Sequence, residues 1–352
     1  MTSKRLAPHL AALWGMIGGL LLIARAALAA GPIEVVASLS DLGKVAEAVG
    51  GDRVHVTTIA QGVQDPHFVD PKPSYMVKLR DAELLLVNGL DLEVGWIPQL
   101  IEGARNGKLR AGGPGYVDCS KNIPLIEMPP PNTTRADGDV HPFGNPHYTT
   151  DPLNFKFIAE TVAEALSRLR PEDADGFAKR KKAFQAGIDR ALFGAELVEL
   201  VGGSKLDRLA RSGELASFLE SEVGGVKLKD KLGGWLGKLA PLRGASIVFY
   251  HRSYSYFAQR FGLNVASYIE LKPGIQPGPS HLADLIEQVR RDKIGIVAAH
   301  PFNNEKIARL VADKGGARFV LLPLNVGGVP GTSDVTAFFD FVTSAFARAT
   351  AK

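Results

Sequence analysis

Apolar residues in the first part of the chain alternate between the spacing of strands and that of helices. Short apolar or alternating runs at 33–37, 54–60 and 83–89 predict β-strands. Helical spacing between them predicts one helix that ends at Gly50 and a second over 74–82. Because strands separated by helices at this distance pair in parallel, the pattern predicts a parallel sheet with helices on its faces.

The same alternation returns near the C-terminus. Strands are predicted at 245–250, 264–271, 294–300 and 318–324. Helices are predicted at 254–262, 280–292, 304–316 and 333–349. This run therefore predicts a second α/β lobe of the same kind.

The middle of the chain is predicted to be helical. Residues 111–150 are irregular, and a helix is then expected with Asp151 as its N-cap and Pro152 in its first turn. The apolar face of this helix would carry Phe155, Ile158, Val162 and Leu166.

A second, longer helix is predicted from Glu172 to Leu200, because Pro171 interrupts the first one. A helix of about 28 residues is roughly 42 Å long at 1.5 Å per residue, which is too long for one face of a small lobe. We therefore expect it to connect the two lobes. The following segment also has helical spacing, but it is interrupted by glycine pairs at 202–203, 224–225 and 233–234.

The fold class expected from these elements is α/β, with two (β/α) lobes that contain parallel sheets and are joined by a long rigid helix. The predicted segments are a signal peptide at 1–29, an N-terminal lobe at 30–170, a linking helix at 171–200, a helical glycine-rich insert at 201–241 and a C-terminal lobe at 242–352.

The N-terminus has the pattern of a cleavable secretory signal peptide. Lys4 and Arg5 precede an apolar run at 10–23, and small residues at 27–29 offer a cleavage site. The run is shorter than the ~20 residues that a membrane-spanning helix needs. Cys119 cannot form an intramolecular disulfide, and it lies far from the place of a lipid-attachment cysteine. We therefore expect a soluble protein in the bacterial periplasm. It is also expected to be a monomer.

Composition and charge narrow the possible partners. The chain of 352 residues is 45% hydrophobic and 22% charged, which is typical of a globular protein. Loss of the signal peptide removes Lys4, Arg5 and Arg25 from the 41 basic residues, which leaves 38 against 37 acidic ones. A nearly neutral mature chain gives no electrostatic reason to expect nucleic acid as a partner.

Histidines at the ends of predicted strands are the strongest candidates for chemistry. His67 follows the second strand in "QDPHFVDPKPS", whereas His251 and His300 each close a strand in the C-terminal lobe. His141 and His147 lie in "GDVHPFGNPHYTTDP". Ligands bind beyond the carboxyl ends of parallel strands, and imidazole suits zinc and other late first-row metals.

Each of these histidines also has a structural alternative. A loop histidine can be a surface or hydrogen-bonded residue, and we favour that interpretation for His55 and His281. For His141, the sequence favours a transient metal ligand and no functional role equally. His300 could have a structural role, in which it forms hydrogen bonds with backbone groups at the end of its strand. Adjacent prolines stiffen the loops of His67 and His147, as a preformed metal site requires.

Four motifs together resemble a known family. "QDPHFVDPKPS", "GNPHYTTDP", "VFYHRSYSYFAQRFGL" and "ELKPGIQPGPSHLADLIE" are similar, in order and spacing, to the solute-binding proteins of zinc and manganese ABC transporters. The resemblance implies two lobes joined by a rigid helix, with His67, His147 and His251 as metal ligands between them. In that family, histidine at the third position is associated with zinc and a carboxylate with manganese.

The fourth ligand departs from the family pattern. Many members have an aspartate in the loop after the last strand, where this chain has Asn325. The resemblance therefore implies Asn325 as the fourth ligand, with Asp334, His300 or a water as alternatives. The long histidine-rich loop of many zinc-binding members is reduced here to His141.

The expected function is capture of Zn2+, with Mn2+ as the second choice, and its delivery to an ABC permease in the inner membrane. The protein is not expected to be an enzyme. An alternative is a secreted zinc hydrolase, with Asp65 or Glu270 as general base. A metal-donor protein or adhesin on the same scaffold is a third possibility, which the insert at 201–241 would favour.

Overall fold

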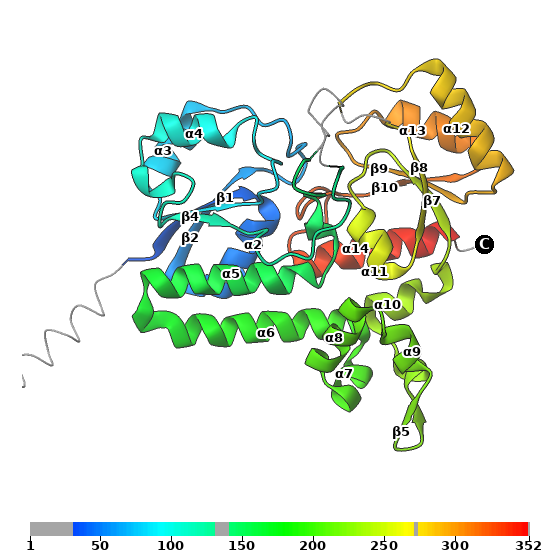
Figure 1. Cartoon of the computed structure of the whole chain (residues 1–352), viewed down its shortest axis with the longest axis horizontal. Helices are drawn as coiled ribbons and strands as arrows, with labels where there is room; N and C mark the ends of the chain where they lie inside the picture. The colour runs from blue at the N-terminus through cyan, green and yellow to red at the C-terminus, as the bar shows by residue number, and fades with distance from the viewer. Residues whose placement is uncertain (1–30, 131–140, 271–273, 351–352) are drawn as a thin grey trace, which may run out of the picture.

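A computed structural model describes residues 31–130, 141–270 and 274–350, so the predicted signal peptide lies outside the described residues. Two α/β lobes lie side by side, and the long helices α5 and α6 run beneath the first lobe toward the second (Figure 1). Within the described residues, no helix is both long and apolar enough to span a membrane.

Each lobe is built on a four-stranded parallel sheet. The first sheet has the order β2-β1-β3-β4 and the second has the order β10-β9-β7-β8. When the strands of each lobe are numbered in sequence order, the first strand therefore pairs with the second on one side and with the third on the other. The strands are β1 Ile33–Leu39, β2 Val54–Ala60, β3 Leu84–Val87, β4 Tyr116–Asp118, β7 Ser246–Phe249, β8 Asn264–Tyr268, β9 Ile296–Ala299 and β10 Arg318–Leu321.

Helices follow nearly every strand and cover both faces of the sheets. This explains why β3 and β9 are buried along their whole length and read as continuous apolar runs. The helices are α2 Ser40–Gly50, α3 Pro73–Asp81, α4 Ile97–Ala104, α5 Asn154–Leu169, α6 Ala174–Phe193, α7 Ala195–Val201, α8 Gly203–Ser212, α9 Leu215–Leu219, α10 Gly234–Leu239, α11 Ser255–Phe261, α12 Pro279–Arg291, α13 Glu305–Gly315 and α14 Val335–Thr350.

The connecting helix is shorter than the sequence predicted. Helix α6 covers 20 residues, and Gly194 ends it with a φ of +89°. A Cβ on Gly194 would lie 2.7 Å from the Cα of Gly233, so the helix stops where the two backbones meet. The predicted continuation to Leu200 is therefore wrong, and those residues form the separate helix α7. Helix α6 still packs against α2 and α5 of the first lobe and against α10, which contacts α14.

The predicted start of α5 also needs a correction. The helix begins at Asn154, and no side chain caps its first turn. Asp151 instead accepts a hydrogen bond from the Leu153 N–H and forms an ion pair with Arg260 of α11. The predicted apolar face is correct, because Phe155, Ile158, Val162 and Leu166 are fully buried. The sequence pattern did not reveal α4 or the short strand β4.

The segment after α6 contains helices α7 to α10 and an antiparallel hairpin, β5 Glu222–Val223 and β6 Val226–Lys227. It is anchored by buried Leu206 and by the Lys156 ammonium of α5, which lies 2.7 Å from carboxylate oxygens of both Asp189 and Asp207. The hairpin projects away from both lobes (Figure 1).

Candidate metal site

His67 lies in the loop that leaves β2, and hydrogen bonds hold the histidine ring and the residue before it. The Asp65 carboxylate accepts a hydrogen bond from the His67 Nδ1 at 2.7 Å. The indole N–H of Trp96 donates to the Pro66 carbonyl at 2.9 Å. Burial alone would raise the pKa of Asp65, but its hydrogen bond and charge interaction with His67 outweigh this effect and lower it.

His147 lies just before α5 and is almost completely buried. Its N–H donates to the Asn145 side-chain carbonyl at 2.9 Å. The Asn88 amide, at the end of β3, donates to the Pro146 carbonyl at 3.0 Å. Burial lowers the pKa of His147 well below its usual value, and the neighbouring histidines add to this effect. The ring is therefore neutral at pH 7, which is the state that binds a metal.

His251 follows β7 and contributes a ring from the second lobe. Its Nδ1 lies 3.2 Å from the Oε2 of Glu270, which follows β8. A carboxylate accepts hydrogen bonds, so Asp65 and Glu270 place the ring protons of His67 and His251 on Nδ1. Each Nε2 then presents a lone pair to the space between the lobes, an arrangement typical of metal-binding histidines.

The candidate ligands converge as two close pairs. The Nε2 atoms of His147 and His251 are 3.3 Å apart, and those of His67 and His141 are also 3.3 Å apart. The rings of His67 and His147, which belong to different pairs, have centroids 5.1 Å apart. Two nitrogens bound to one tetrahedral zinc ion at 2.0–2.1 Å are separated by about 3.3 Å. The spacing within each pair therefore matches one edge of a tetrahedral site.

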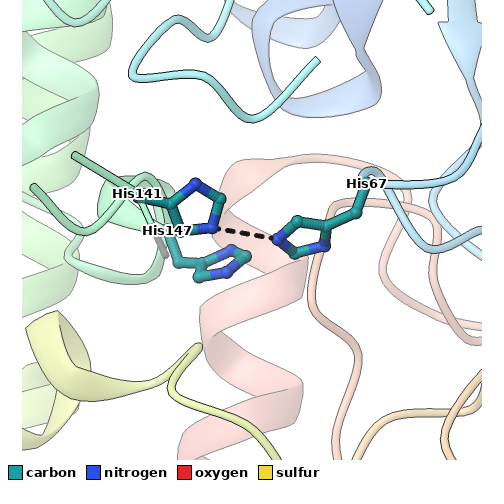
Figure 2. A group of neighbouring side chains, drawn as sticks. All are labelled: His67, His141 and His147. Carbon is teal, nitrogen blue, oxygen red and sulfur yellow. Dashed lines mark hydrogen bonds between the residues drawn. The ribbon is translucent and has the colours of Figure 1, made fainter. Parts of the chain in front are cut away.

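His141 is the member of this cluster that sequence reasoning left undecided. Figure 2 shows its ring beside His147 and directed at His67 from the opposite loop. Ligand atoms of His67, His141 and His147 all lie within 4.8 Å of one another. The signal in the sequence was the position of His141 six residues before His147. This spacing alone does not show whether the ring of a loop histidine reaches a metal site.

The other fourth-ligand candidates have different surroundings. Asn325 is buried in the loop after β10, and among the described residues no hydrogen bond joins its side chain to the four histidines. Asp334 uses its carboxylate to accept the Ala337 N–H at the start of α14. His300 is buried between the Leu322 carbonyl, which accepts from Nδ1 at 2.9 Å, and the Ser253 hydroxyl, which is 2.5 Å from Nε2. Burial lowers the pKa of His300 to about 4.

The two carboxylates considered as general bases are bound to the histidines themselves. Asp65 and Glu270 contact Nδ1 of His67 and His251, on the side of each ring that faces away from Nε2. Such partners orient ligands and increase their basicity. The geometry therefore assigns both carboxylates to support of the rings and gives the hydrolase alternative no observation in its favour.

Two α/β lobes with imidazoles gathered between them define a metal-binding protein of the solute-binding class. The model of the family "Zinc-uptake complex component A periplasmic" matches residues 35–192 and 230–348. The chain belongs to this family, whose members are substrate-binding proteins of metal ABC transporters and not enzymes. The unmatched residues between the two parts are most of the segment that carries α7 to α9 and the hairpin.

Individual relatives are distant in sequence. The manganese ABC transporter substrate-binding lipoprotein PsaA of Streptococcus mitis is 22% identical over 265 residues, which cover 74% of this chain and 70% of PsaA. The metal ABC transporter lipoprotein FimA of Streptococcus parasanguinis is 22% identical over 314 residues, 88% of this chain and 86% of FimA. Both alignments therefore cover most of this chain.

Solved structures share the fold. A crystal structure of ZnuA aligns with a TM-score of 0.67 at 22% identity and covers 91% of this chain and all of that one. A periplasmic metal-binding protein from Candidatus Liberibacter asiaticus aligns with a TM-score of 0.61 at 18% identity, over 90% of this chain and 98% of that one.

Proposed function

We propose that this protein captures Zn2+ between its lobes with His67, His147, His251 and His141. The observation that carries this proposal is the pair of Nε2–Nε2 separations of 3.3 Å, each of which matches an edge of a tetrahedral zinc site. The first three residues are those expected from the sequence. The fourth position is given to His141 in place of Asn325 because its Nε2 already faces the other ligands.

The choice of zinc rests on donor chemistry. Four neutral imidazoles suit a tetrahedral late first-row ion, whereas Mn2+ prefers carboxylate, carbonyl and water oxygens in an octahedral arrangement. The family name points to zinc, and several relatives are named for manganese. Because the carboxylates of Asp65 and Glu270 are directed at Nδ1 atoms, they favour an all-nitrogen site.

Delivery completes the proposed function. The chain would be exported to the periplasm by a signal peptide at 1–29, act as a monomer without a lipid anchor, and hand the ion to an ABC permease in the inner membrane. In this proposal the lobes at 30–170 and 242–352 enclose the ion, and the insert at 201–241 lies outside the binding region. The ligands must be deprotonated, so affinity is expected to fall as the pH drops through the histidine range.

The test is metal content and competitive affinity of the mature protein with each candidate ligand changed to alanine. His67→Ala, His147→Ala and His251→Ala are expected to lose Zn2+, whereas His55→Ala, an exposed histidine paired with Glu34, is the control. Unchanged zinc stoichiometry and affinity in all three variants would refute the proposed site. Preference for Mn2+ in direct competition would overturn only the metal assignment.

A second comparison identifies the fourth ligand. His141→Ala is expected to weaken Zn2+ binding more than Asn325→Ala does, because only His141 has a ring nitrogen directed at the cluster. The opposite order would return the fourth position to Asn325.

A further inference from the structure

The boundary between the lobes is crossed by hydrogen bonds immediately beside His147 and His251. Asn145 accepts the His147 N–H with its side-chain carbonyl, and its amide donates to the Arg252 carbonyl at 2.8 Å. One side chain therefore joins the backbone next to one histidine with the backbone next to the other. The Tyr256 hydroxyl, also from the second lobe, donates to the Asn145 carbonyl at 3.1 Å.

An ion pair strengthens this crossing a few residues further along both segments. The Arg260 guanidinium contacts both oxygens of the Asp151 carboxylate at 2.9–3.1 Å. Its remaining nitrogen Nη1 donates to the Ala210 carbonyl at 2.6 Å. The side chains of Arg260 and Asp151 are only 13% and 7% exposed. Separation of this pair would leave each buried charge without the opposite charge that it now contacts, so the pair resists opening.

All of these contacts are made by the chain itself. They hold the segments of His147 and His251 together, and the two Nε2 atoms lie 3.3 Å apart. A site whose ligands are fixed in advance loses less conformational freedom when it binds. The contacts therefore reduce the conformational freedom that the two rings would lose when they bind an ion.

We propose that Asn145 and Arg260 are positioning residues that preset His147 and His251 as a preformed half of the metal site across the lobe boundary. This inference deepens the proposed function and rests on it for the identity of the bound ion. The contacts between the two segments join protein groups only, so their coupling can be measured without any metal.

The first test is amide hydrogen exchange of the metal-free full-length mature protein. Residues 145–153 and 250–260 are expected to be protected to a similar degree in the wild type. Asn145→Asp, which keeps the carbonyl oxygen and removes the amide donor, is expected to speed exchange in both segments together. Arg260→Gln should do the same, whereas Arg53→Gln, which breaks the remote ion pair with Asp173, should leave both segments unchanged.

The outcome that overturns the inference is faster exchange only in the segment that carries the substitution. If Arg260→Gln does not fold, Asn145→Asp and Tyr256→Phe still decide the question, because both are close in shape to the residues they replace. Neither readout depends on metal, so failure of the proposed zinc function would leave this result interpretable.

The second test uses Co2+, whose visible absorption reports the coordination geometry. Asn145→Asp and Arg260→Gln are expected to weaken Co2+ binding about tenfold or more, in the range found for residues that orient metal ligands. Arg260→Lys should restore part of the loss, and Arg53→Gln should bind as the wild type does. A wild-type spectrum and affinity in both positioning variants would contradict the inference, whereas absence of Co2+ and Zn2+ binding in the wild type would contradict the proposed function instead.

Discussion

At the scale of single residues, the candidate ligands are held by neighbours that contact Nδ1 and not the clustered Nε2 atoms. Asp65 lies 2.7 Å from the Nδ1 of His67 and is itself partly buried. Such a carboxylate fixes the tautomer and the orientation of the ring, so its removal weakens a metal site without removing a ligand.

We therefore predict that Asp65→Ala lowers the Zn2+ affinity by about 10- to 100-fold, as is typical for partners of ligating histidines. Competition with a chromophoric chelator measures this affinity. Asp70→Ala is the matched control, because Asp70 is an exposed carboxylate in the same loop. Equal affinities of the two variants would contradict the prediction.

Asp41, in the first turn of α2, gives a prediction for the pH dependence of stability. Burial raises its pKa from 3.8 to about 7, and its Oδ2 has no hydrogen-bond partner within the described part of the chain. The folded protein thus holds this proton more tightly than the unfolded chain does. The stabilisation from Asp41 is complete below pH 4 and is lost as the pH rises through 7.

The wild type should therefore lose on the order of 4 kcal/mol relative to Asp41→Asn between pH 4 and pH 8, from a difference of about 3 pKa units. Urea unfolding at several pH values measures both proteins. The comparison is needed because His300 acts in the opposite direction: its pKa is lowered to about 4, so stability is lost as the pH falls below 6.5. Parallel pH profiles of wild type and variant would contradict the prediction.

The sequence singled out three of the four clustered histidines, and two of them for a topological reason. His67 lies in the loop after a predicted parallel strand and His251 closes another, and ligands bind beyond the ends of such strands. His147 was singled out by its stiff loop and by the family resemblance. His141 and Asn325 were harder to assign, because each lies in a loop whose path depends on contacts with the other lobe. The cross-lobe bond between Asn145 and the Arg252 carbonyl had no signal in the sequence at all.

At the scale of elements, single glycines decide where helices end and how closely they pack. Local sequence predicted helical character through residues 172–200, since one glycine inside a helical pattern does not define a break. The break at Gly194 arises from its close approach to Gly233, which is 39 positions further along the chain. Most strands and helices were predicted within a few residues because their periodicity is local, whereas this contact is not.

We predict that Gly194→Ala destabilises the protein by roughly 1–3 kcal/mol, because alanine is strained at this φ and its Cβ would meet Gly233. Gly187→Ala, inside α6 with open space around its Cα, should instead stabilise by up to about 1 kcal/mol. Urea unfolding of both variants measures the two effects. A similar change in the same direction for both variants would argue against a backbone contact as the cause of the helix end.

At the scale of the whole molecule, the lobes also touch at a second place, between the start of α2 and the loop after β10. Ser40 donates its hydroxyl proton to the Val326 carbonyl at 2.7 Å, and Asp41 accepts the Val326 N–H. Beside them, a Cβ on Gly62 would lie 2.1 Å from the Val326 oxygen. Together with α6, these contacts favour small rather than wide movements of the lobes.

We predict that Gly62→Ala pushes the lobes apart and weakens Zn2+ binding, because the new methyl group must displace the backbone of the second lobe. Gly107→Ala is the control for this variant, since nothing lies within 4 Å of a Cβ at that position.

The same contacts predict small lobe movements in the wild type. Small-angle X-ray scattering should therefore show no resolvable change of the wild-type radius of gyration on addition of Zn2+. A large contraction of the wild type on metal binding would contradict the prediction.

The matching strand order of the two sheets carries a consequence for the origin of the molecule. In each lobe the first strand is flanked by the second and third, with the fourth beyond the third. Such a repeat is what duplication and fusion of one ancestral gene would leave behind. Each half of the present chain supplies only part of the histidine cluster, His67 and His147 from one and His251 from the other, so neither half contains the whole cluster.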